Sequence, residues 1–169
     1  MGRITPIVAG VLIVVGGWWA WGWLFPSDEV LIRRTLDRIA AAVGNEDGDG
    51  NLARLGRVAT LREEFHPDLF VDAGAPFREL RGREAVIGAV ARTGGVLQDL
   101  EVSFTDVVIA VDPSRQAASA TMVAEAQFRE GDAGGPAYEA RELEVAFVQH
   151  EGRWVVAEVR LVGGLTPLR

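Results

Sequence analysis

The side chains that could carry acid–base or metal chemistry are few in this sequence. Its two histidines are His66, which precedes a proline, and His150. Cysteine is absent, which excludes a thiolate nucleophile and a thiolate-bound zinc ion. Spacing places no third group beside either histidine, and two histidines without a patterned carboxylate are typical of neither a metal site nor a catalytic triad. We therefore expect solvated or capping roles for both histidines, with no catalytic residue and no cofactor.

Charged side chains of both signs gather near the C-terminal end. Arg141, Glu142 and Glu144 lie in one stretch of alternating hydrophobicity, and Glu158 and Arg160 lie in the next. If the two stretches are neighbouring strands, these charges form cross-strand pairs on a solvated face of a sheet. The alternative is a pocket or docking surface, whose candidate residues are His66, Asp72, Tyr138, Glu144, Glu158 and Arg160.

The acidic stretch from residue 44 to residue 51 is similar to the first half of a calcium-binding loop. Asn45, Asp47 and Asp49 stand where such a loop has oxygen ligands, and Gly50 follows them. The loop also requires a bidentate glutamate at its twelfth position, where this sequence has Gly56. Because Asn, Asp and Gly are also ordinary turn formers, the stretch predicts a turn, with calcium binding as the alternative.

An uncharged stretch over residues 7–25 precedes all of these groups. As a helix it would be about 28 Å long, close to the thickness of the hydrocarbon core of a bilayer. Gly16 and Ala20 form a small-xxx-small pair that suits close helix packing, although glycine is also simply common in membrane helices. A cleaved signal peptide is the alternative, but the apolar run is longer than a usual signal core. Four tryptophans at its C-terminal end suit the membrane interface: Trp18, Trp19, Trp21 and Trp23.

The sequence thus divides into two parts. Residues 1–26 are expected to form a tail and a transmembrane helix, and residues 27–169 one domain with its own core. Arg3 precedes the span and acidic residues follow it, which favours a single-pass protein of a bacterial inner membrane with its C-terminal domain in the periplasm. Arg33, Arg34 and Arg38 lie soon after the span and support the opposite orientation, which stays open.

The domain begins with helical periodicity and changes to strand periodicity. Helices are expected over residues 30–43, from residue 52 to near Pro67, and over 82–93, with short strands over 68–73 and 77–80. Four long strands are expected over residues 97–112, 116–129, 137–150 and 154–162, joined by short turns. This order predicts an α+β domain, in which a curved antiparallel sheet of four to six strands is covered by about three helices. One face of the second long strand is rich in small residues, which suits close cover by a helix: Ala118, Ala120, Met122, Ala124, Ala126 and Phe128.

Three local motifs occur in the order and spacing of a known superfamily. They are EFHPDLFV from Glu64 to Val71, LRGREAV from Leu80 to Val86, and a closing hairpin from Val145 to Val156 that contains Gly-Arg-Trp. Together with the element order, they make residues 27–162 resemble the nuclear transport factor 2-like superfamily, which includes ketosteroid isomerase, scytalone dehydratase and polyketide cyclases. The resemblance implies a cystatin-like cone in which the sheet and the helices enclose a pocket.

The resemblance does not extend to the catalytic groups of the isomerase. That enzyme needs an aspartate base and an oxyanion hole made by a tyrosine and a protonated aspartate. The corresponding positions hold Ile39 in place of the tyrosine and Ala73 in place of the base, while Glu144 falls near the protonated aspartate. Asp72 is next to the base position, but a shift of one residue points a strand side chain to the opposite face. We therefore do not expect isomerase chemistry.

These observations predict a membrane-anchored, non-catalytic accessory or interaction subunit of a larger envelope, transport or bioenergetic complex. Its partners would be the lipid bilayer and other membrane-protein subunits. A net charge of −7 argues against nucleic acid. The alternative is a tethered protein that binds a small apolar ligand, or a cyclase- or isomerase-like enzyme, that uses the cone pocket. Buried carboxylates in an open pocket would favour the alternative, and large apolar side chains filling it would favour the accessory subunit.

Overall fold

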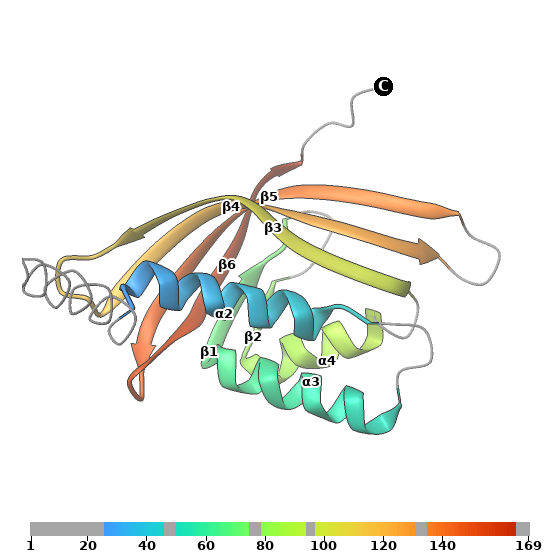
Figure 1. Cartoon of the computed structure of the whole chain (residues 1–169), viewed down its shortest axis with the longest axis horizontal. Helices are drawn as coiled ribbons and strands as arrows, with labels where there is room; N and C mark the ends of the chain where they lie inside the picture. The colour runs from blue at the N-terminus through green and yellow to red at the C-terminus, as the bar shows by residue number, and fades with distance from the viewer. Residues whose placement is uncertain (1–25, 46–49, 75–78, 94–96, 131–134, 165–169) are drawn as a thin grey trace, which may run out of the picture.

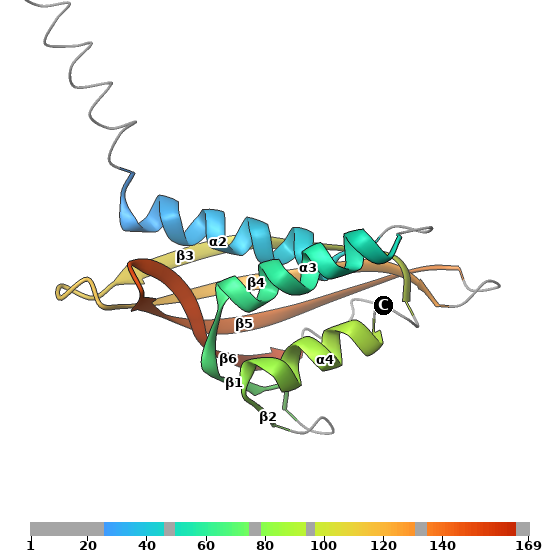
Figure 2. The same cartoon turned by 90° about the horizontal axis from the view of Figure 1, so that it is seen from below.

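The computed structural model describes residues 26–45, 50–74, 79–93, 97–130 and 135–164. These residues form one curved sheet with helices on one of its faces (Figure 1, Figure 2). The elements follow in the order α2 (Asp28–Val43), α3 (Asn51–Glu64), β1 (Phe65–Asp72), β2 (Leu80–Arg81), α4 (Arg83–Thr93), β3 (Leu97–Val111), β4 (Ala117–Glu130), β5 (Pro136–His150) and β6 (Arg153–Gly164). The α+β class, the three helices and the four long strands are confirmed for this part of the chain.

The six strands lie in the order β2-β1-β6-β5-β4-β3. The four long strands are antiparallel neighbours joined by short connections, as the sequence predicts. The expectation of a wholly antiparallel sheet is wrong at one place, since β1 pairs with β6 in parallel. These two strands are far apart in the sequence. No hairpin joins them, so nothing forces them to run in opposite directions. The mixed sheet leaves β2 and β3 as its two edges.

The core lies between the helices and the face of the sheet that they cover. On α2, Ile32, Leu36 and Ile39 recur at helical spacing and are buried. They belong to the same packed cluster as Phe147 of β5 and Met122 of β4. Small residues on β4 let the helix layer approach, because Ala118 and Ala120 are buried against that cluster. The predicted small-residue face is therefore confirmed, although Ala124, Ala126 and Phe128 are only partly buried.

The first turn of α2 forms hydrogen bonds to the end of the sheet that contains the β3–β4 turn and the start of β6. The Ser27 hydroxyl oxygen accepts from the backbone N–H of Val30, which makes Ser27 the N-cap of α2, a position at which serine is common. Asp28 accepts two further bonds, from Arg115 Nε at 2.6 Å and from Trp154 Nε1 at 3.2 Å. The Arg115 guanidinium holds the pKa of Asp28 below its usual value, and the Trp154 indole acts in the same direction.

This arrangement predicts a pH-dependent loss of stability. Because the pKa of Asp28 is lower in the folded chain than in the unfolded one, its charged form stabilises the fold above about pH 4, and the stabilisation is lost as the pH falls below that value. Asp28→Asn should therefore be less stable than the wild type at pH 7, and the difference should shrink as the pH falls below about 4, as measured by urea unfolding followed by circular dichroism. A stability difference that persists unchanged at pH 2 would contradict this role.

Several expectations fall on residues that the structure does not describe. Among the described residues, no helix is long and apolar enough to span a membrane. The predicted span over residues 7–25 lies outside the described residues, with its four tryptophans and the Gly16 and Ala20 pair. Asp47 and Asp49 of the calcium candidate also lie outside them.

Candidate functional site

Four of the six candidate polar residues come together on the sheet. Asp72 on β1, Arg160 on β6 and Glu144 on β5 stand opposite one another in register. Glu158 forms an ion pair with Arg160, with 2.7 Å between Arg160 Nη2 and Glu158 Oε1. Glu144 lies next in sequence to the buried Val145, so the cluster points to the face of the sheet that the helices leave uncovered. The structure thus places these residues outside the space between the sheet and the helices.

The two remaining candidates lie elsewhere. Tyr138 is 59% exposed near the start of β5. His66 at the start of β1 lies against His150 at the end of β5, with ring centroids 5.0 Å apart and nearly perpendicular rings. His66 Nδ1 accepts a hydrogen bond from the backbone N–H of Asp68. Within the described residues, no three potential metal ligands gather, and the histidine pair has no third ligand among them.

Among the described residues, the space between the sheet and the helices has no acid–base side chain at the positions that correspond to the catalytic tyrosine and aspartates of the isomerase. Ile39 on α2 is part of the packed core, and Glu144 points away from it. The buried core cluster between the sheet and the helices includes the large side chains of Phe147, Met122 and Trp154. The described residues therefore offer no acid–base group at any of the three corresponding positions in the interior.

One carboxylate is nevertheless buried, and the sequence analysis missed it. Glu64 at the end of α3 is 5% exposed and receives two bonds from Arg38 on α2, Nε to Oε1 at 2.6 Å and Nη2 to Oε2 at 3.0 Å. Arg38 Nη2 also donates to the hydroxyl of the buried Thr35. The Glu64 carboxylate holds the pKa of Arg38 above its usual value, so the guanidinium stays charged. A signal was present in the sequence, since Glu64 follows the buried Leu61 at helical spacing.

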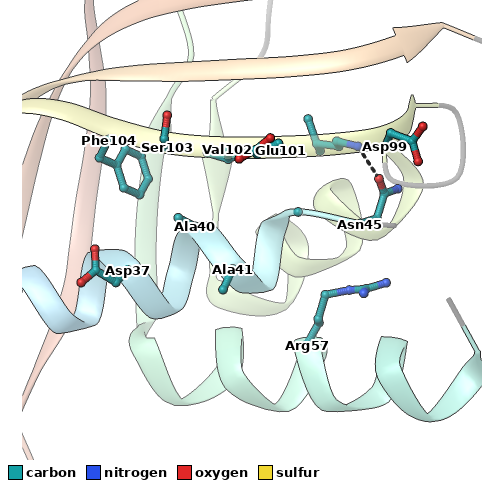
Figure 3. A pocket seen from close by; sticks show the side chains of 12 residues that line it. Asp37, Ala40, Ala41, Asn45, Arg57, Asp99, Glu101, Val102, Ser103 and Phe104 are labelled. Atoms are coloured by element: carbon teal, nitrogen blue, oxygen red, sulfur yellow. Dashed lines mark hydrogen bonds between the residues drawn. The ribbon is translucent and has the colours of Figure 1, made fainter. Parts of the chain in front are cut away.

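A groove of about 930 Å³ lies between α2 and β3 (Figure 3). One wall is formed by small residues of α2, Ala40, Ala41 and Gly44, with Asp37 one turn earlier. The other wall is formed by the first half of β3, from Asp99 to Phe104, and Arg57 of α3 reaches the groove as well. No sequence motif marks this site, because the site depends on how α2 lies along the edge of the sheet.

Asn45 closes one end of this groove. Its backbone N–H donates to the Leu100 carbonyl at 2.9 Å, and its side-chain oxygen accepts from the Leu100 N–H at 2.7 Å. Its side-chain NH₂ donates to the Leu97 carbonyl at 2.9 Å. Asn45, a calcium candidate in the sequence, thus uses its amide group to bind the backbone of an edge strand.

Comparison with known proteins identifies the fold. Residues 29–160 match the model of the SnoaL-like domain family. A search of curated protein sequences finds no match. The fold expected from the resemblance to the nuclear transport factor 2-like superfamily is confirmed by this match and by the arrangement of the strands and helices.

The similar solved structures include two candidate enzymes and an association domain. A candidate scytalone dehydratase from Novosphingobium aromaticivorans aligns with a TM-score of 0.66 and 16% identity, over 79% of this chain and 82% of that one. A candidate aromatic ring hydroxylase from the same organism aligns with a TM-score of 0.68 and 14% identity, over 84% and 92%. The association domain of CaMKII from C. elegans aligns with a TM-score of 0.58 and 15% identity, over 77% and 91%. At such identities the likeness shows the fold alone.

Proposed function

The chain belongs to the SnoaL-like domain family, and from this premise we propose that it is a non-catalytic binding domain. In this proposal, the apolar stretch over residues 7–25 tethers the domain to the bacterial inner membrane, and the domain contacts other subunits of a membrane complex from the periplasmic side. The family fold serves enzymes and binding domains alike, so the choice between them depends on the groups present in this chain.

One observation carries the proposal. Among the described residues, Glu64 is the only buried carboxylate, and Arg38 neutralises it through two short hydrogen bonds. A general acid or base has to present an exchangeable proton or a free lone pair to a substrate, and a carboxylate clamped by a guanidinium inside a helix–helix contact presents neither. Since Ile39 and Ala73 replace the catalytic tyrosine and aspartate of the isomerase, binding is the activity that the described interior supports best.

A small apolar ligand is the second candidate. Towards one end of the sheet, Ala124, Ala126, Phe128 and Leu143 are only partly buried, whereas Ala118, Ala120 and Val145 on the same face are buried. Apolar side chains that the core leaves partly open are typical of a wall for such a ligand.

One purification experiment distinguishes the partner-binding proposal from the small-ligand alternative. We expect the full chain to sediment with native membranes, to dissolve only in detergent, and to carry other polypeptides in fixed ratio through mild detergent purification and native mass spectrometry. Deletion of residues 1–25 should release the chain from the membrane fraction. A lone polypeptide in every mild detergent would contradict the proposal, and a lone polypeptide that carries a small organic adduct would favour the second candidate.

A further inference from the structure

The β3 edge of the sheet presents backbone groups to the groove. The pairing register places Glu101, Ser103 and Thr105 opposite Gln127, Glu125 and Val123 of β4. The N–H of Asp112 donates to the Ala117 carbonyl, so odd-numbered residues of β4 direct their backbone groups to β3. Antiparallel strands alternate in this respect, and the N–H and C=O of Val102 and Phe104 therefore point away from β4. Leu100 is also even-numbered, and its N–H and C=O likewise point away from β4, since both bond to Asn45.

This stretch of edge is short and has defined ends. Asp99 and Asp106 both have positive φ, at 49° and 51°, and the pairing with β4 shifts at both places. Such bulges interrupt an edge strand on either side of a regular segment. At the first bulge Asn45 binds the backbone of Leu97 and Leu100, and at the second Arg33 donates to the carbonyl of Val107 at 2.9 Å. No described residue outside the sheet bonds the backbone of Val102 or Phe104, which lie between these two covered ends.

The surroundings of this segment suit another strand. A strand added to a sheet lies about 4.8 Å from its neighbour, and the groove beside β3 is bordered on α2 by small residues. Figure 3 shows Ala40 on the side of α2 that faces β3, and Ala41 on the side towards α3. A Cβ added at Gly44 would lie 3.0 Å from the Leu100 carbonyl oxygen, so glycine is what permits the close approach at the closed end.

Three of the four charged residues that line the groove are acidic, and Arg57 is the basic one. Asp37 on α2 and Glu101 on β3 are exposed, line the groove, and form no ion pair with a described residue. Asp99, at the closed end, is paired with Arg129. Two copies of this chain joined edge to edge through β3 would bring these free carboxylates together, which disfavours a second copy as the occupant. Arginine or lysine side chains on the occupant would instead pair with them.

We propose that the groove between α2 and β3 binds an extended, basic segment of a partner protein, which adds a strand to the sheet at Val102 and Phe104. The segment forms backbone hydrogen bonds to these two residues. Because Asp37 is on α2 and Glu101 points to the uncovered face of the sheet, the segment carries basic side chains on both of its faces, one set against Asp37 and the other against Glu101. This inference rests on the proposed function as a binding domain and assigns that function a site and a class of partner.

The test uses the full ¹⁵N-labelled chain in detergent micelles and a synthetic peptide. The probe is the acetylated, amidated heptapeptide Thr-Arg-Arg-Val-Arg-Arg-Thr, which carries arginine on both faces of a strand, and its counterpart with glutamate in place of arginine is the control. We expect the basic peptide to bind in an NMR titration, and amide exchange at Val102 and Phe104 to slow by about tenfold or more at saturation. The acidic peptide should leave the spectrum unchanged.

Two further peptides separate strand addition from simple charge attraction. In each, alternate backbone amides are N-methylated, and the two peptides carry the methyl groups on complementary sets of residues. Only one set of amides can face β3, so one methylated peptide should bind at least about tenfold more weakly while the other binds as the parent does. Equal binding by all three peptides, or equal loss from both methylated ones, would overturn the proposed strand.

Variants of the chain address the same site. Val102→Pro removes one donor from the free edge, where proline is tolerated, and should weaken peptide binding by about tenfold or more. Asp37→Asn together with Glu101→Gln should weaken it by about fivefold and reduce its dependence on salt, whereas Glu142→Gln on the uncovered face should do neither. One outcome is that the peptide fails to bind while other polypeptides still co-purify equally with the wild type and with Val102→Pro. In that case the strand-addition site is wrong, and the proposed function as a binding domain stands. If no polypeptide co-purifies, the proposed function fails.

Discussion

Phe147→Ala is expected to lower the free energy of unfolding by about 4 kcal/mol, the range found when a large aromatic side chain is removed from a packed core. The side chain is fully buried near the C-terminal end of β5, and its register neighbours are Ala118 on β4 and Val156 on β6. Ala118 is too small to fill the hole, and the β4 backbone cannot move inward without breaking its pairing with β3. Most of the cavity should therefore persist.

Equilibrium urea unfolding, followed by circular dichroism, measures this loss. Tyr138→Ala is the matched control, because it removes an aromatic side chain from the same strand at an exposed position and should cost about 0.5 kcal/mol or less. A loss below about 1.5 kcal/mol for Phe147→Ala would show that the interior is loosely filled there. Such an interior would favour an open pocket over a packed core.

Arg38→Met is expected to lower the free energy of unfolding by about 3 kcal/mol, the lower end of the range for breaking a buried ion pair. The substitution leaves the Glu64 carboxylate buried without its two hydrogen bonds from the guanidinium. The lower end applies because half of the Arg38 side chain is exposed, while that of Glu64 is 6% exposed. Water can therefore reach part of the pair once the guanidinium is gone.

The double variant Arg38→Met with Glu64→Gln makes this prediction specific. It removes both charges and should recover most of the stability that Arg38→Met loses, because a neutral amide costs less to bury than an unpaired carboxylate. Thermal unfolding of the two variants and the wild type at one pH measures the recovery. If Arg38→Met alone were as stable as the wild type, Glu64 would not depend on the guanidinium, and it would become available for acid–base chemistry.

Local patterns predicted most of the elements, because each pattern reflects an interaction within one element. The helical spacing of Ile32, Leu36 and Ile39 corresponds to the buried face of α2, and strand alternation placed Ala118, Ala120 and Met122 on the covered face of the sheet. The parallel pairing of β1 with β6 could not be predicted this way. It joins segments more than 80 residues apart, and no turn between them sets their direction.

The site was less predictable for the same reason. Polar residues were candidates because of their chemistry, yet Asp72, Glu144 and Arg160 meet on the uncovered face of the sheet. The groove between α2 and β3 is defined by backbone groups and by small residues such as Ala40 and Ala41, which carry no chemical signal in a sequence. Asn45 shows the difficulty well, since its type and spacing suggest a metal ligand while its amide binds the edge of β3.

Photo-cross-linking in native membranes tests most directly whether this domain works by binding another polypeptide. A photoreactive residue is introduced into the full chain at Ala41, which lines the groove, and separately at Ser119, which is exposed on the uncovered face of the sheet. We expect a cross-link from Ala41 to a polypeptide other than this chain, and we expect this cross-link to disappear when Val102→Pro is added. Absence of any cross-linked polypeptide at both positions, with the chain intact in the membrane, would contradict the proposed function.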